Sequence, residues 1–156
     1  MNLDGLVTQD KAEAGEWFPV ELYGKPADFD LLILGDDSDT VTRFNREAMK
    51  KLKGAVTKDK KGNIGEFDDE TIDAMFDSNE EAVLVRIAGI RGWKRDRDKK
   101  GKIVNENPEP VTLNSKEIKS DKESFKLLIT KIPAIKEFVM GKARDRTNFL
   151  SGPSGN

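Results

Sequence analysis

The stretch that decides the fold runs from Trp17 to Gly35 and reads WFPVELYGKPADFDLLILG. Residues 17–23 and 29–35 are rich in aromatic, β-branched and other apolar residues, a composition typical of strands. Residues 24–28 between them hold Gly and Pro, which favour a turn because Gly tolerates unusual backbone dihedrals and Pro fixes φ. The stretch therefore predicts a β-hairpin, or two strands of a small meander.

Helical patterns follow the two strands. The cluster Asp36–Asp39 offers side-chain oxygens that can cap a helix, and apolar residues then recur on one face at helical spacing, which predicts a helix over 39–53. A second apolar stripe from Ile72 to Ile90 predicts another helix that ends near Arg91, with Val83–Val85 as an alternative short strand.

The last third of the chain predicts a loop and two further helices. Residues 94–110 are highly charged and contain Gly and Pro, so we expect a loop or a weak hairpin. The stretch Ser120–Glu123 has the form of a capping box that opens a short helix. Pro133 suits the first turn of a last helix, which we expect to reach about Asn148. The fold class is α+β, an N-terminal antiparallel hairpin or meander followed by three to four helices, with helix predominating.

A length of 156 residues fits one domain. We expect a flexible N-terminal lead over 1–14, a single α+β domain over 15–150 and a flexible tail over 151–156. The alternative within the domain is two small lobes, 15–53 and 67–150, joined by a flexible polar loop.

Composition argues against several classes of function. Lys and Arg number 27 and Asp and Glu 29, whereas nucleic-acid binders usually carry a basic excess. The chain has no Cys and no His, which removes thiolate zinc sites, thiol nucleophiles and the common catalytic triads. Its apolar runs fall far short of the about 20 residues needed to span a bilayer. We therefore expect a soluble cytoplasmic protein without enzymatic activity, cofactor or membrane contact.

Two acidic stretches are candidate metal sites. Asp36–Asp39 could place paired carboxylates for a metal-dependent hydrolase, but helix capping explains the same residues. The stretch Asp96–Asn107 partly follows the calcium-loop pattern, with Lys100 at a position that needs an oxygen ligand. We expect no metal at either stretch.

Three aromatic residues are candidate interface anchors, with the sealing of a small core as the alternative. They are Trp17, Phe18 and Trp93.

The order of three segments resembles tail assembly chaperone-like proteins of long-tailed, siphovirus-type bacteriophages. The first is GEWFPV (15–20) leading to FDLLILGDDSD (29–39), the second is IRGW (90–93), and the third is SDKE (120–123) followed by PAIKEFV (133–139) and RTNFL (146–150). The charged segment after Trp93 is longer and more basic than that pattern.

The resemblance implies a chaperone in the host cytoplasm that is absent from the mature virion. It would bind the phage tape measure protein, with the tail tube protein as a second candidate partner, and would need no nucleotide. Homo-oligomerisation stays open. From the residues themselves, the apolar positions suited to a helical client are Phe125, Leu128, Ile135 and Phe138, with core packing as the alternative for at least half of them.

Two other classes of function remain as alternatives. A virion structural protein, such as a tail completion or connector subunit, would explain the charged surface equally well. A small metal-dependent hydrolase would use the carboxylates of Asp36–Asp39.

Overall fold

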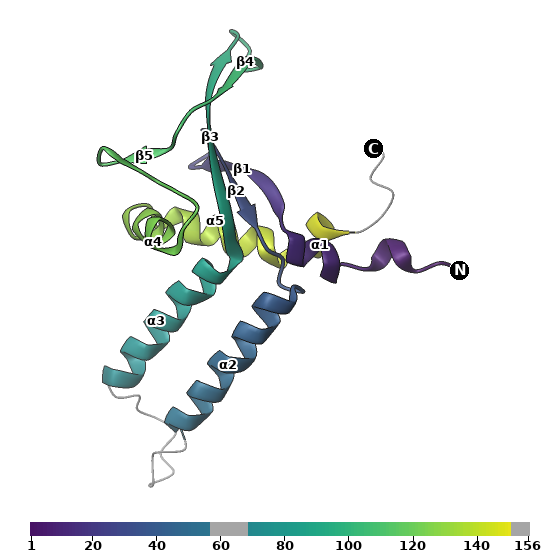
Figure 1. Ribbon diagram of the computed structural model, residues 1–156, viewed down its shortest axis with the longest axis vertical. Coiled ribbons are helices and arrows are strands. Elements are labelled where there is room, and N and C mark those ends of the chain that lie inside the picture. The colour runs from purple at the N-terminus through teal and green to yellow at the C-terminus, as the bar shows by residue number, and fades with distance from the viewer. Residues whose placement is uncertain (57–68, 151–156) are drawn as a thin grey trace.

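The computed structural model describes residues 1–56 and 69–150 (Figure 1). Helix exceeds strand, 46% against 29%, and a four-stranded antiparallel sheet is combined with five helices, so the predicted α+β class is confirmed. The strand order is β1-β2-β3-β4. The strands are β1 (Glu16–Leu22), β2 (Lys25–Ile33), β3 (Ile87–Arg97) and β4 (Ile103–Pro108).

The β1–β2 hairpin is tighter than the sequence predicted. Tyr23 and Gly24 both have positive φ, 54° and 74°, which is the type I′ geometry that matches the twist of paired strands. Pairing therefore starts at once, with Leu22 opposite Lys25. The predicted turn over 24–28 is wrong beyond Gly24, because Lys25 and the residues after it already belong to β2.

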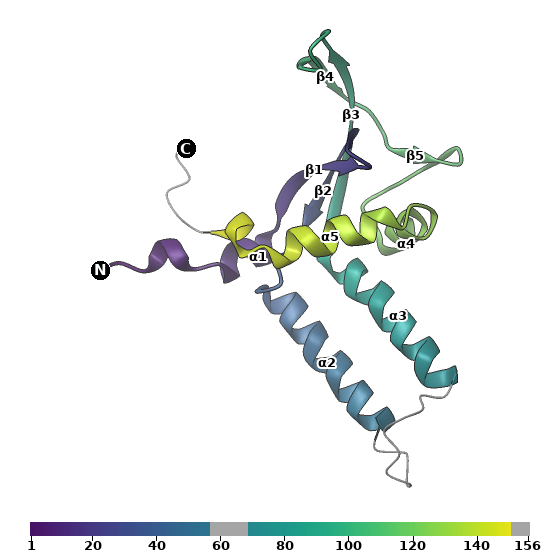
Figure 2. The same ribbon diagram turned by 180° about the vertical axis from the view of Figure 1, so that it is seen from behind.

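A helical hairpin is inserted between the neighbouring strands β2 and β3. Helices α2 (Asp39–Val56) and α3 (Asp69–Arg86) lie side by side and project away from the sheet in both views (Figures 1 and 2). The predicted helix over 39–53 is confirmed and continues to Val56. Most of the predicted polar loop between the two helices lies outside the described residues.

The predicted second helix is wrong beyond Arg86. The chain enters β3 at Ile87, and Val83–Val85, the alternative strand, lies within α3. From Ile87 on, β3 pairs with β2 on one side and with β4 on the other, so tertiary pairing overrides the helical spacing. The charged segment 94–110 is largely a hairpin, of which β4 forms the second strand.

The C-terminal part comprises a two-stranded hairpin, two helices and a 3-10 turn. These are β5 (Thr112–Leu113), β6 (Lys116–Glu117), α4 (Lys122–Lys131), α5 (Ala134–Arg144) and η2 (Arg146–Phe149). The expected last helix thus ends earlier than Asn148, and Pro133 is its N-cap. The capping residue of α4 is Asp121, whose carboxylate accepts from the Ser124 amide at 2.7 Å. The predicted cap, Ser120, instead accepts from the Ile90 amide at 3.1 Å.

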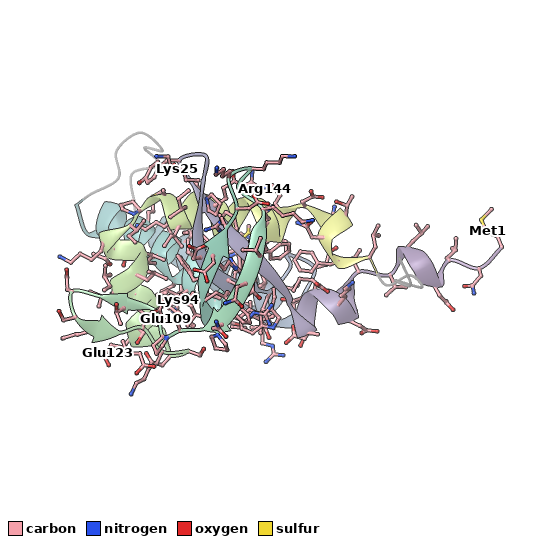
Figure 3. All side chains as sticks on the ribbon, turned by 90° about the horizontal axis from the view of Figure 1, so that it is seen from above. Met1, Lys25, Lys94, Glu109, Glu123 and Arg144 are labelled. Carbon is pink, nitrogen blue, oxygen red and sulfur yellow. The ribbon has the colours of Figure 1, made fainter. Side chains whose placement is uncertain are left out.

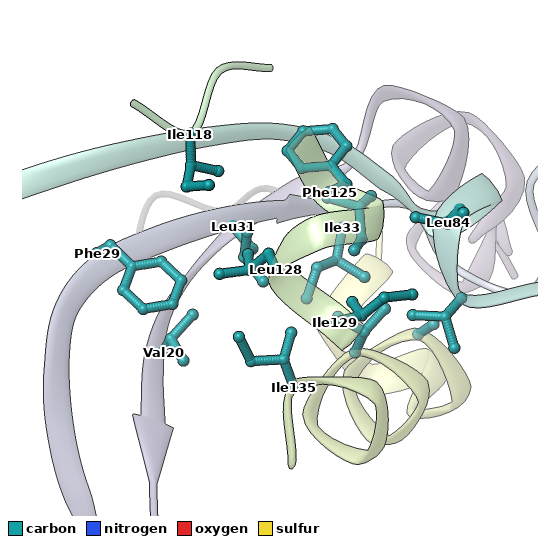
Figure 4. Close-up of a cluster of buried hydrophobic side chains, with 14 residues drawn as sticks. Val20, Phe29, Leu31, Ile33, Leu84, Ile118, Phe125, Leu128, Ile129 and Ile135 are labelled. Atoms are coloured by element: carbon teal, nitrogen blue, oxygen red, sulfur yellow. The ribbon is translucent and has the colours of Figure 1, made fainter. Parts of the chain in front are cut away.

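The core fills the space between one face of the sheet and helices α4 and α5 (Figure 4). Alternate residues of β1 and β2 point to this side because successive side chains of a strand face opposite ways. The largest fully buried side chains include Leu31 and Ile33 from β2, and Ile129 and Ile135 from the helices. We call this side of the sheet the closed face.

The N-terminal segment packs on the body through a short helix, α1 (Gln9–Ala14). Ala12 is fully buried, and a Cβ at Gly35 would lie 2.8 Å from both the Ala12 Cβ and the Phe149 ring, so glycine is required there. Before α1 comes η1 (Asp4–Leu6), and Met1 lies at the far end of an extension that leaves the body (Figure 3). Along the described chain, no helix combines the length and apolarity that a bilayer crossing requires.

Candidate protein-binding site

Three of the four residues predicted for partner binding lie in the core. Phe125, Leu128 and Ile135 are almost completely buried between α4, α5 and the sheet. Phe138 is partly buried at the margin of the core, with the Lys142 ammonium 5.6 Å from its ring centre. Core packing therefore accounts for the first three, and a partner has no access to them in this conformation.

The opposite side of the sheet, here the open face, carries no helix in the described part of the chain. Helices α4 and α5 lie on one side of the sheet only (Figures 1 and 2). The open face receives the alternate residues of the strands, among them Trp17 from β1, Asp30 from β2 and Arg91 from β3. It is a charged and aromatic surface, whereas the closed face is apolar.

Asp30 lies at the centre of the open face and is 4% exposed. Its carboxylate accepts from Arg91 Nε and Trp93 Nε1, each at 2.8 Å, and from Arg95 at 3.3 Å. Burial opposes ionisation, but these three hydrogen bonds outweigh it and hold the pKa of Asp30 below its ordinary value. The carboxylate is thus ionised and fully engaged at neutral pH.

The ion pairs continue outward along β3 to β4. The Arg95 side chain is 8% exposed, and its Nε donates to Glu106 on β4 at 2.8 Å. Arg97 donates to both oxygens of Asp28, and these bonds lower the pKa of that carboxyl. A planar guanidinium with several donors suits such shared contacts. The open face is therefore a connected network of fixed charges.

Two tryptophans complete the open face. The Arg91 guanidinium carbon lies 4.3 Å from the Trp17 ring centre and 5.5 Å from that of Trp93. Trp17 reaches across β2, so that a Cβ on Gly89 of β3 would lie 3.1 Å from its ring. Trp17 is 37% exposed and the Arg91 side chain 45%, so both present a large, fixed surface to solvent. Trp and Arg are the residues most enriched among binding hot spots.

The cluster Asp36–Asp39 is engaged in structural contacts. Its four side chains contact, in order, Arg86 at 2.9 Å, Arg146 at 2.9 Å, the Val41 amide at 3.0 Å and Arg43. Ser38 is thus the side chain that caps α2, and the neighbouring carboxylates are held by arginines. Within residues 1–56 and 69–150, no group of three or more acidic side chains is placed to hold a metal ion.

The sequence contained a signal for the open face that the predictions missed. Arg91, Trp93, Arg95 and Arg97 alternate with period two, which is the pattern of one side of a strand. The alternation runs across the boundary between the predicted helix, which ends near Arg91, and the predicted loop or weak hairpin over 94–110. Of the three candidate anchors, Trp17 and Trp93 lie on the open face. Phe18 packs toward the core, with its ring edge-on to that of Phe149.

Compared with protein-family models, curated proteins and solved structures, the chain gives no match.

Proposed function

We propose that this protein is a non-catalytic binding factor, a phage tail assembly chaperone that holds the tape measure protein in the host cytoplasm during tail assembly. The observation that carries the proposal is the open face, where Trp17 and Arg91 form a fixed, exposed surface that no helix of the described residues covers. The identity of the client rests on the order of sequence segments that resembles tail assembly chaperone-like proteins.

The electrostatics of the described carboxylates favour binding over acid–base chemistry. A general acid or base works best with a pKa near neutrality. Hydrogen bonds from Arg91, Trp93 and Arg95 outweigh burial and lower the pKa of Asp30, and those from Arg146 and Thr8 lower the pKa of Asp37. Carboxylates held in this way are stable anions that position arginines.

The open face suits a client that is held and later released. Its side chains are ordered before the client arrives, so binding costs little side-chain entropy. The indole and guanidinium surfaces can cover apolar and acidic parts of a long chain, while the charged remainder of the surface keeps the complex in solution. Tail tube subunits would displace the chaperone as they polymerise around the tape measure protein.

Co-expression with the tape measure protein tests the proposal. The full-length protein should raise the soluble yield of this client without added nucleotide, and the double variant Trp17→Ala/Arg91→Ala should lose most of that effect. The matched control is Met49→Gln, which alters an exposed apolar residue of α2 remote from the open face. Thermal unfolding of each variant shows whether it is folded.

Two outcomes would overturn the proposal. The client stays insoluble although the chaperone is in excess, or the protein is present at stoichiometric levels in purified virions. In the second case, the role of a virion structural protein takes its place.

A further inference from the structure

Arg91 is held in one orientation by contacts on two sides. Its guanidinium stacks on Trp17 at 4.3 Å and its Nε donates to Asp30 at 2.8 Å. Trp17 is itself held in place, because its ring lies over Gly89, with Leu32 directly opposite Trp17 in the β1–β2 pair. The side chain of Arg91 is therefore ordered without any partner.

The outer end of the Arg91 guanidinium is available to a ligand. Of the Arg91 guanidinium nitrogens, only Nε donates a hydrogen bond to the Asp30 carboxylate. Among the described residues, no acceptor is bonded to the two terminal nitrogens of Arg91. Arg95 and Arg97 have carboxylates of their own in Glu106 and Asp28, whereas Arg91 shares the buried Asp30. Next to Trp17, the terminal nitrogens of the Arg91 guanidinium are therefore exposed to a partner, while the Asp30 carboxylate that pairs with Arg91 is buried.

We propose that Arg91 and Trp17 together recognise a carboxylate that is flanked by an apolar side chain in the partner protein. Two parallel N–H donors at the end of a guanidinium match the two oxygens of a carboxylate, a geometry that adds specificity as well as affinity. The exposed indole of Trp17 beside it supplies an apolar platform for the neighbouring residue. The inference rests on the proposed function, and it names the chemistry of the client segment that the open face selects.

The chain contains two tryptophans, Trp17 and Trp93, and both lie on the open face, so tryptophan fluorescence, excited at a wavelength that tyrosine does not absorb, reports on this site. The probe is a blocked pentapeptide, acetyl-Gly-Leu-Glu-Leu-Gly-amide, titrated into the full-length protein. The same peptide with Gln in place of Glu should bind about tenfold more weakly, since a hydrogen bond to an ionised group is roughly twice as strong as a neutral one. This comparison needs no protein variant.

A variant pair assigns the effect to Arg91. Arg91→Lys keeps the charge but loses the planar fork, and should reduce the preference for Glu over Gln to about twofold or less. The matched control is Arg43→Lys on the exposed side of α2, where the preference should stay unchanged. Addition of salt should weaken the binding of the Glu peptide more than that of the Gln peptide, since exposed charges are screened.

Three results would overturn the inference: equal affinity for the Glu and Gln peptides, a preference that survives Arg91→Lys, or displacement of the Glu peptide by inorganic phosphate at lower concentration than by acetate. The last result would assign the site to phosphate groups. If the peptides behave as expected but the tape measure protein is not solubilised, the proposed function fails and the carboxylate site stands. If the client is solubilised but the Glu and Gln peptides bind equally, the carboxylate site is wrong and the proposed function stands.

Discussion

The two faces of the sheet are built from alternate residues of the same strands, yet they are held together by different interactions. In β2, Leu31 points into the core beneath α4 and α5, while its neighbours Asp30 and Leu32 point to the open face. The closed face is stabilised by removal of apolar area from water, which acts without direction. The open face is ordered by hydrogen bonds and ring contacts with defined geometry. One strand thus contributes both to the apolar core and to a charged and aromatic surface of fixed geometry.

The largest expected effect comes from the closed face. Leu31→Ala removes a fully buried side chain and leaves a cavity, so we expect a loss of about 3–4 kcal/mol in the free energy of unfolding. Leu32→Ala, one residue along on the open face, is the matched control and should cost about 1–2 kcal/mol, because that side chain is only half-buried. Urea denaturation measures both. Equal losses would contradict the difference between the faces.

The next effect probes the centre of the open face. Asp30→Asn leaves Arg95, which is nearly buried, with Glu106 as its main carboxylate partner, and we expect a loss of about 3 kcal/mol. Glu106→Gln, at the exposed end of the same chain of contacts, should cost under about 1 kcal/mol. If both variants unfold at the same urea concentration as the wild type, the network is not a source of stability.

The dependence of stability on pH should also differ between the two faces, because the paired carboxylates Asp30 and Asp28 belong to the charged network of the open face. Asp30 and Asp28 have a lower pKa in the folded protein than in the unfolded chain, so they bind fewer protons when folded. Their stabilisation is fully present above the ordinary Asp pKa of about 3.9 and is lost as the pH falls from there through the lowered values. We therefore expect the melting temperature to fall as the pH is lowered from about 4 to about 2.

Asp30→Asn should flatten that pH profile, whereas Leu31→Ala should lower it at every pH without changing its shape. A profile of unchanged steepness in Asp30→Asn would show that other carboxylates, such as Asp37 beside Arg146, govern the acid transition.

The sequence predicted those parts of the fold that depend on neighbouring residues. The β1–β2 hairpin and the helix that begins at Asp39 follow from local composition, turn chemistry and a cap within a few positions. The helix prediction is wrong for the first residues of β3, because Ile87 and Ile90 continue the helical spacing of α3 and only pairing with β2 ends that helix. The capping residue of α4 was placed one position early, because Ser120 is drawn away by the Ile90 amide.

The candidate site depended even more on distant contacts. The open face brings Asp30 to Arg91 and Arg95, which lie more than sixty positions further along the chain. No local pattern predicts that pairing, since its register is set by the β2–β3 ladder. Phe125, Leu128 and Ile135 fit a helical client because they are apolar and lie on helices, and these same properties place them in the core.

The smallest expected effect compares one ring contact on each face. On the open face, a double-mutant cycle of Trp17→Ala and Arg91→Ala should give a coupling free energy of about 0.5–1 kcal/mol for the cation–π pair. On the closed side, a cycle of Phe18→Ala and Phe149→Ala, whose ring centres lie 6.1 Å apart, should give about 0.5–1.5 kcal/mol. The two coupling energies are thus similar, but the single variants should differ strongly in their loss of unfolding free energy. Loss of the Phe149 ring opens a cavity in the packed interior, whereas Arg91→Ala removes a side chain that is nearly half exposed. The open face should therefore tolerate loss of this pair without unfolding of the domain. A coupling above about 2 kcal/mol for Trp17 and Arg91 would contradict this, since the stack would then be part of the folding core.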